Sequence, residues 1–360
     1  MKKIDLYIIK KFLGTFFFAL ALLIVVTIVF DLSEKVDNFI DRGAPLKSII
    51  FDYYMNFVPF FANMFSQLIV FIAVIFFTSR MASKTEFIAM FSSGISRTRL
   101  LLPYFIGASV ITIMSFVLGS YIIPPANEKK LEFEQRYIRK SNPTVTAYNM
   151  HSQVQPNVYF YIEYFNKDES EGVNVSLEKF DNSLLVSKLS AQKMRWDSTK
   201  NKWTFFNYKL RNFYGDKEEF FVGKMIDTSF NIYPHNFYKL SKVIETMNLH
   251  ELNKYIEEQK LSGTPEVTAS LIEKYSRIAS PFACYILTLI GFSLSLRKVR
   301  SGGIGFNIGV GLFLSFVYIF FMKFSSVLAL SGTLSPLFAV WTPNIIFMII
   351  ALILYFTRQE

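Results

Sequence analysis

Six long runs of residues without a single charge constrain the fold of this 360-residue chain more than any other feature. They cover residues 12–30, 53–79, 100–127, 278–296, 301–322 and 324–357. A helix needs about 20 apolar residues to cross the roughly 30 Å hydrocarbon core of a bilayer, so each run is long enough. Turn-forming residues between Ser331 and Pro336 place the last helix at about 337–356. Because backbone N–H and C=O groups cannot stay unpaired in lipid, we expect six transmembrane helices.

The first run follows a group of lysines, as the apolar part of a secretory signal peptide would. These are Lys2, Lys3, Lys10 and Lys11. The run is longer than the apolar part of such a peptide, which has about 7–15 residues, and no small-x-small cleavage site follows it. We therefore interpret the first run as a retained span.

The lysines and arginines between the runs predict which side of the membrane each loop occupies. The N-terminus, the 80–99 loop, the 297–300 loop and the C-terminus carry twelve of them, against four in the opposite short segments. This asymmetry places both termini in the cytoplasm. The net charge of +10 would otherwise suggest a nucleic-acid partner, but nearly all of it lies in the predicted cytoplasmic segments, so we expect no nucleic acid.

Residues 124–276, between the third and fourth runs, have a different pattern of polar and apolar residues and are predicted to lie on the outer side of the membrane. Short β-branched or aromatic stretches predict strands at 158–165, 173–177, 202–208 and 219–226. Several short strands with polar turns are typical of an all-β jelly roll or sandwich. A helix should follow, because Leu249, Leu252, Ile256 and Leu261 have helical spacing.

The predicted fold is therefore an α-helical membrane protein with three plus three transmembrane helices and an inserted all-β, jelly-roll-like domain. The helical parts are residues 1–123 and 277–360, and the inserted domain with its helical return is 124–276.

The residues that would carry catalysis or bind a cofactor are missing. The chain has no G-x-x-x-x-G-K-[ST] phosphate loop, so we do not expect it to hydrolyse ATP. His151, His235 and His250 lack metal-ligand spacing, and the lone Cys284 cannot form an internal disulfide. No constellation of acid, base and nucleophile is recognisable. We expect neither an enzyme nor a bound metal or cofactor.

The loop from Ser83 to Gly94, between the second and third runs, contains a predicted short helix. Thr85 could cap this helix, Glu86 in its first turn suits the helix dipole, and Gly94 supplies a C-terminal stop. Its apolar side consists of Phe87, Ile88, Met90 and Phe91. The helix could rest on lipid head groups, or it could be a coupling helix seated in a groove of a cytosolic partner.

Cations near the predicted outer membrane surface form a second candidate site. They are Lys35 and Arg42 after the first span, Arg136 and Arg139 after the third, and Lys323 at the close of the fifth. They could be snorkelling residues of the membrane interface. Alternatively, cations from several helices could surround the phosphates of a lipid head group.

Three stretches, in this order along the chain, carry a resemblance to a known family. They are E-F-I-A-M-F-S-S-G-I-S at 86–96, R-I-A-S-P at 277–281, and L-S-P at 334–336 followed by A-V-W-T-P-N at 339–344. The first resembles the E-x-x-x-M-x-x-x-G-(hydrophobic)-S/T stretch of the lipopolysaccharide export permeases, the LptF/LptG family. The other two resemble the start of the fourth span and the C-terminal stretch of the same family. The resemblance covers essentially the whole chain.

The resemblance implies a permease half of an ABC transporter in the bacterial inner membrane, with the β domain in the periplasm. In that family two permeases form the membrane part, and a separate cytosolic ATPase dimer supplies energy. The complex extracts lipopolysaccharide and passes it to a periplasmic bridge of jelly-roll folds. Glu86 matches the coupling-helix acid that meets a basic residue of the ATPase, and Phe87, Met90 and Phe91 would fill the groove beside it.

The segment after the first span matches the family only in part. Val36-Asp37 matches the family's V-D, where basic residues contact lipid phosphates, and favours a G-type over an F-type member without deciding between them. Lys35 and Arg42 are the basic residues that this chain retains there. Expected basic positions are instead occupied by Glu34, Ile40 and Asp41.

Two alternatives stay open at this stage. The chain could be a permease for another lipid or a lipoprotein. It could also be a non-transporting membrane scaffold or sensor whose β domain binds a partner.

Overall fold

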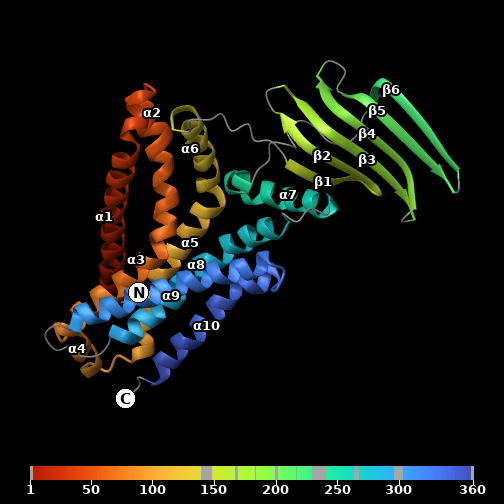
Figure 1. Cartoon of the computed structure of the whole chain (residues 1–360). Helices are drawn as coiled ribbons and strands as arrows, with labels where there is room; N and C mark the ends of the chain where they lie inside the picture. The colour runs from red at the N-terminus through yellow and green to blue at the C-terminus, as the bar shows by residue number, and fades with distance from the viewer. Residues whose placement is uncertain are drawn as a thin grey trace. The chain divides into compact units, whose positions relative to one another are not determined.

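The computed structural model describes residues 3–138, 148–166, 169–182, 184–198, 202–215, 217–228, 241–262, 267–295 and 303–357. They divide into two compact units (Figure 1). A helical unit comprises Met1–Ile138 and Leu271–Glu360, and a sheet unit comprises Arg139–Ser270. The helical unit thus runs past residue 123, because the third long helix continues without a break to Tyr137.

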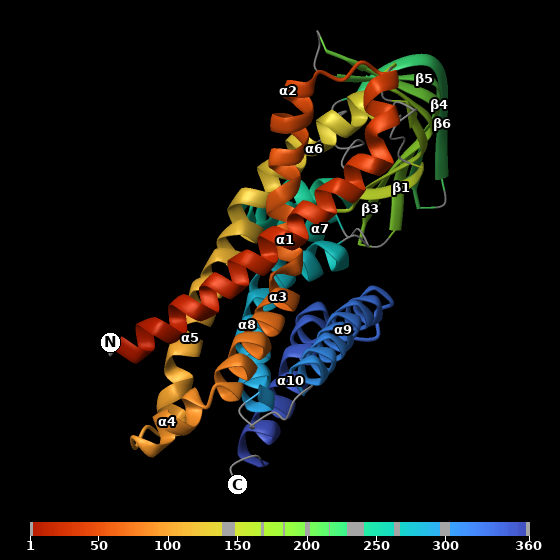
Figure 2. The same cartoon turned by 90° about the vertical axis from the view of Figure 1, so that its left-hand side faces the viewer.

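Among its described residues, the helical unit contains six helices that are long and apolar enough to cross a membrane, as predicted. The first and second are α1 (Lys3–Asp41) and the continuous α2 (Leu46–Ser48), η1 (Ile49–Tyr54) and α3 (Met55–Ser83). The third combines α5 (Arg97–Val117), η2 (Leu118–Ile122) and α6 (Ile123–Tyr137). The last three are α8 (Val267–Ser295), α9 (Gly303–Leu330) and α10 (Pro336–Thr357). A short helix, α4 (Glu86–Ser92), connects α3 to α5 at one end of the unit (Figure 2).

Helix α9 corrects one prediction, because Lys323 lies inside the helix and does not close it. The helix ends where Gly332 takes a left-handed φ of +79°, and Gly332 N–H donates to Ala329 O at 3.0 Å. A lysine continues a helix easily, and its long side chain can carry the charge towards water. A glycine with positive φ is the stronger terminating signal.

The core of the helical unit is built from apolar residues of all six long helices. Close approach of two helices is clearest at Gly107 on α5, where an added Cβ would lie 2.5 Å from the ring of Phe12 on α1. Polar side chains add bonds between helices: Tyr318 Oη donates to Asn344 Oδ1 at 2.8 Å, and Asn344 Nδ2 donates to Ala279 O at 2.9 Å. Small residues at contacts and such hydrogen bonds are the usual means of packing helices in lipid.

The described segments of the sheet unit form six antiparallel strands, each paired with the next in chain order (Figure 1). They are β1 (Tyr148–Gln155), β2 (Val158–Asn166), β3 (Glu171–Asp181), β4 (Leu184–Asp197), β5 (Lys202–Tyr214) and β6 (Lys217–Thr228). The predicted strands correspond to β2, β3, β5 and β6, which confirms an all-β insertion between the third and fourth long helices. In the described part of this unit the connectivity is an up-and-down meander.

One face of the sheet carries its core, which includes Phe160, Met194, Trp203 and Phe205. At the edge hairpin, Arg211 Nη2 donates to Glu218 Oε2 at 2.9 Å, which lowers the pKa of the Glu218 carboxyl below its ordinary value. Both side chains are exposed, so this pair contributes little to stability.

The predicted return helix is present as α7 (Leu249–Ser262), preceded by η4 (Ser241–Thr246). Asn248 Oδ1 accepts from the backbone N–H of His250 at 2.9 Å and of Glu251 at 3.0 Å. In return Glu251 Oε2 accepts from Asn248 N–H at 2.9 Å, which completes a capping box. The predicted stop, Gly263 to Pro265, lies outside the described residues.

Candidate functional site

The short helix α4 begins immediately after a strained residue, Thr85. Thr85 has φ +60°, a left-handed conformation that is unfavourable for a β-branched side chain. The prediction that its side chain caps α4 is wrong, because Thr85 Oγ1 bonds to Lys84 O at 2.7 Å and to no N–H of α4. The left-handed backbone is what turns the chain sharply from α3 into α4.

The other end of α4 is closed by a Schellman motif, so the predicted stop at Gly94 is confirmed. Gly94 N–H donates to Phe91 O at 2.9 Å, and Ile95 N–H donates to Met90 O at 3.2 Å. Gly94 takes φ +81°, which glycine adopts without strain. Met90 and Ile95, which flank the motif, both pack against the helical core.

The apolar residues of α4 divide between the core and the surface. Phe87 is only 2% exposed and belongs to the core of this chain, and its ring lies 6.3 Å from that of Phe91. Met90 and Phe91 are partly buried against the same core, as expected for residues three and four positions after Phe87. Ile88 lies on the other side and is 50% exposed. The large apolar side chain of α4 that stays exposed is therefore Ile88, which the family pattern did not single out.

Glu86 accepts a hydrogen bond from a residue far away in sequence. Tyr7 Oη, on α1, donates to Glu86 Oε2 at 3.2 Å. Nearby on the same helix, Asp5 is buried and pairs with Arg99 of α5, with Arg99 Nη2 2.7 Å from Asp5 Oδ2. These contacts could not be found from the sequence, because 79 and 94 residues separate the partners and no motif joins them.

The cation after the first span, Lys35, is already paired within the chain. Lys35 Nζ lies 2.5 Å from Asp31 Oδ1, one helical turn earlier, and also donates to Tyr53 Oη. The ammonium lies 5.0 Å from the centre of the Tyr53 ring. Lys35 is thus held by an acid, a phenol and an aromatic face.

One predicted cation contacts an aromatic cluster of the helical unit, and two others come three residues after members of this cluster in the sequence. The cluster joins four segments, with Phe39 on α1, Tyr53 on η1, Phe57 on α3 and Phe133 on α6. Lys35 contacts this cluster through Tyr53. Arg42 follows α1 and is half-buried, whereas Arg136 is exposed three residues after Phe133. Lys323 is exposed on α9, which is not among the segments of the cluster, and Arg139 lies outside the described residues.

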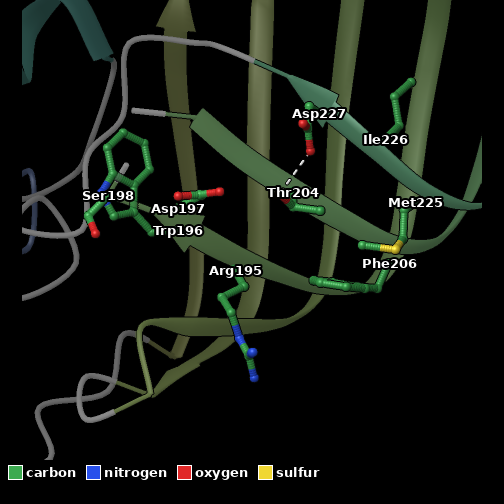
Figure 3. A pocket seen from close by; sticks show the side chains of 9 residues that line it. All are labelled: Arg195, Trp196, Asp197, Ser198, Thr204, Phe206, Met225, Ile226 and Asp227. Atoms are coloured by element: carbon green, nitrogen blue, oxygen red, sulfur yellow. Dashed lines mark hydrogen bonds between the residues drawn. The ribbon is translucent and has the colours of Figure 1, made fainter. Parts of the chain in front are cut away.

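A hollow of about 590 Å³ lies in the sheet unit, where β4 ends, β5 begins and β6 ends (Figure 3). Thr204 Oγ1 donates to Asp227 Oδ1 at 2.8 Å inside it. Arg195 points away from both carboxylates of the hollow and is paired with Glu171 (Figure 3). This mixture of charges does not concentrate positive potential for a phosphate, and no predicted site residue lines the hollow. Its lining is Arg195, Trp196, Asp197, Ser198, Thr204, Phe206, Met225, Ile226 and Asp227.

Comparison with known proteins identifies the family of this chain. A family model described as "Lipopolysaccharide export system permease LptF/LptG" matches residues 6–357. Two curated relatives, the lipopolysaccharide export system permease proteins LptG of Escherichia coli K12 and of Escherichia coli O6:H1, are each 20% identical over 302 residues. Each alignment covers 83% of this chain and 83% of the relative. Because the family model spans nearly the whole chain, this protein belongs to the LptF/LptG family of lipopolysaccharide export permeases.

Proposed function

We propose that this chain is the permease half of an ABC transporter that extracts lipopolysaccharide from the bacterial inner membrane and passes it to a periplasmic bridge protein. A separate cytosolic ATPase dimer supplies the energy. Both termini and α4 are then cytoplasmic, and the sheet unit is periplasmic. The uneven distribution of lysine and arginine supports this orientation.

The geometry of α4 is the observation that carries the proposal. The helix is fixed at both ends and its inner face is packed, while Ile88 is exposed and Glu86 Oε1 has no hydrogen-bond partner in the described residues. An exposed apolar side chain and an available charge on the same short helix are the chemistry with which it fits a hydrophobic groove that has a basic rim. A helix that only rested on lipid head groups would need no such acid.

The exposed helices support a membrane partner of the same family. Of the six spans, α1 and α9 have the smallest share of buried residues. On α9 the exposed Phe306, Phe313, Phe316 and Phe320 recur every three to seven positions along one side. Such a surface suits a second permease and the acyl chains of a lipid, and the cations near the aromatic cluster suit its phosphates.

The test is to replace Glu86 with arginine in the chain co-expressed with its second permease and the ATPase. Reversing the charge places two cations together, so we expect the ATPase to be lost from the complex in mild detergent and lipopolysaccharide release to fall at least tenfold. Glu257→Arg, at an exposed position of α7, is the matched control and should change neither.

An intact complex with unchanged transport in Glu86→Arg would contradict the proposal. Co-purification of a different lipid or a lipoprotein with the wild-type complex would support the alternative substrate. Failure of any ATPase to co-purify with the wild-type chain would support a scaffold or sensor.

A further inference from the structure

We propose that Tyr7 positions the carboxylate of Glu86 and that the inner end of α1 is thereby part of the coupling surface. Movement of α4, driven by the ATPase, would then be passed directly to α1. This inference rests on the proposed function and names the residue through which its docking site drives the membrane part.

The hydrogen bond from Tyr7 gives the two carboxylate oxygens of Glu86 different surroundings. Tyr7 Oη donates to Oε2 at 3.2 Å, and in the described part of the chain Oε1 has no hydrogen-bond partner. A carboxylate can accept on both oxygens, so the phenol fixes the side chain while Oε1 is left to face a basic group. A carboxylate that is oriented by a neighbouring hydrogen bond meets its partner in one geometry and not in many, as metal-binding side chains do when a hydrogen bond orients them.

A second contact joins α1 to the helix that follows α4. Asp5 is 4% exposed, and its Oδ2 lies 2.7 Å from Arg99 Nη2. The backbone N–H of Arg99 in turn donates to Ser96 Oγ at 3.3 Å, which caps the start of α5. The charge pair therefore attaches α1 to the rigid first turn of α5.

Packing makes the first half of α1 move with these elements. Ile8, Phe12 and Phe16 are fully buried in the core, and the ring of Phe12 leaves no room for a Cβ at Gly107 of α5. After Leu20, by contrast, α1 has no buried residue until Phe39. Leu23, Ile24 and Ile28 pack against the cores only partly buried, so the middle of α1 is held less tightly than its two ends. A displacement at the anchored end is thus passed into this middle segment.

The experiment uses the full complex of permeases and ATPase in proteoliposomes and measures ATP hydrolysis and lipopolysaccharide release separately. Tyr7→Phe keeps the ring and removes the hydroxyl, so the thermal unfolding temperature, the assembly and the ATPase rate should stay within about twofold of wild type. The lipid released per ATP should fall about three- to tenfold, as expected for losing one long, solvent-exposed hydrogen bond. Tyr121→Phe removes an exposed hydroxyl from η2 and should leave this ratio unchanged.

A double-mutant cycle separates positioning from a general effect on structure. If Tyr7 acts through Glu86, Tyr7→Phe combined with Glu86→Ala, which leaves no acceptor for the phenol, should release no less lipid per ATP than Glu86→Ala alone. Effects that multiply would overturn the inference, as would an unchanged ratio in Tyr7→Phe. Wild-type complex that releases no lipid with ATP would overturn the proposed function and this inference with it.

Discussion

The two ends of the helical unit differ in how their charged side chains are paired within the chain (Figure 2). At the α4 end, Glu86 accepts from a neutral phenol and keeps one oxygen without a partner in the described chain. At the other end, Lys35 is paired with Asp31 and Tyr53. If Glu86 meets a basic group of a partner and Lys35 meets a lipid phosphate, as proposed, the first charge keeps an open acceptor oxygen and the second has an internal counter-ion.

The largest test of this comparison concerns Phe87. If α4 is a docking element that is already ordered in the free chain, the buried Phe87 holds it against the core. Phe87→Ala should then lower the free energy of unfolding by about 3–5 kcal/mol. Ile88→Ala, one position later, removes an exposed side chain and should cost less than about 1 kcal/mol. Thermal unfolding in detergent measures both.

Docking should respond differently to the two alanine variants. Ile88→Ala should weaken co-purification with the ATPase while stability is retained. A Phe87→Ala protein of wild-type stability that had lost the ATPase would show that Phe87 points into the partner, contrary to the structure.

The contrast between Phe87 and Ile88 also shows how far the sequence could be read. The spans were predictable, because hydrophobic length is a local property that a bilayer demands. The periodicity of α4 grouped its apolar residues, but the family pattern assigned Phe87 to a partner, and only tertiary packing shows that it faces this chain's own core.

Strands β1 and β4 were not predicted from the sequence, and for β4 the reason is local. In β4 the alternation of buried and exposed positions places lysines and arginines between apolar residues, which breaks the apolar run. The contacts of Tyr7 with Glu86 and of Lys35 with Tyr53 were not predicted for a different reason, since these partners lie on other helices. A sequence shows which charges exist, and the fold decides which of them are already satisfied.

The second prediction tests whether Asp31 competes with a lipid phosphate for Lys35. Asp31→Asn removes the counter-ion, so we expect photo-crosslinking of lipopolysaccharide near Lys35 to rise about three- to tenfold, the equivalent of roughly 1 kcal/mol. Lys35→Ala should reduce it below the wild-type level. Asp37→Asn, which neutralises an exposed acid on the same helix, is the control and should have little effect.

Two results would contradict this second prediction. Equal crosslinking in wild type and Asp31→Asn would mean that Asp31 does not compete with the lipid. Unchanged crosslinking in Lys35→Ala would make Lys35 a purely structural residue of the aromatic cluster.

The smallest predicted effect concerns the strain at the start of α4. In the described part of the helical unit, Thr85 is the one residue other than glycine with positive φ. Thr85→Gly should raise the free energy of unfolding by about 1 kcal/mol, because glycine occupies this conformation without steric penalty. Lys84→Gly, at the adjacent residue with φ −85°, should lower it by about 0.5–1 kcal/mol, because there glycine only adds freedom to the unfolded chain. The same substitution at neighbouring positions should thus act in opposite directions, and two shifts of equal sign would show that Thr85 is not strained. If Thr85→Gly also lowers the lipid released per ATP, the strained backbone of Thr85 serves to hold α4 rigid. The fixed orientation of α4 then comes at the expense of the stability of the fold.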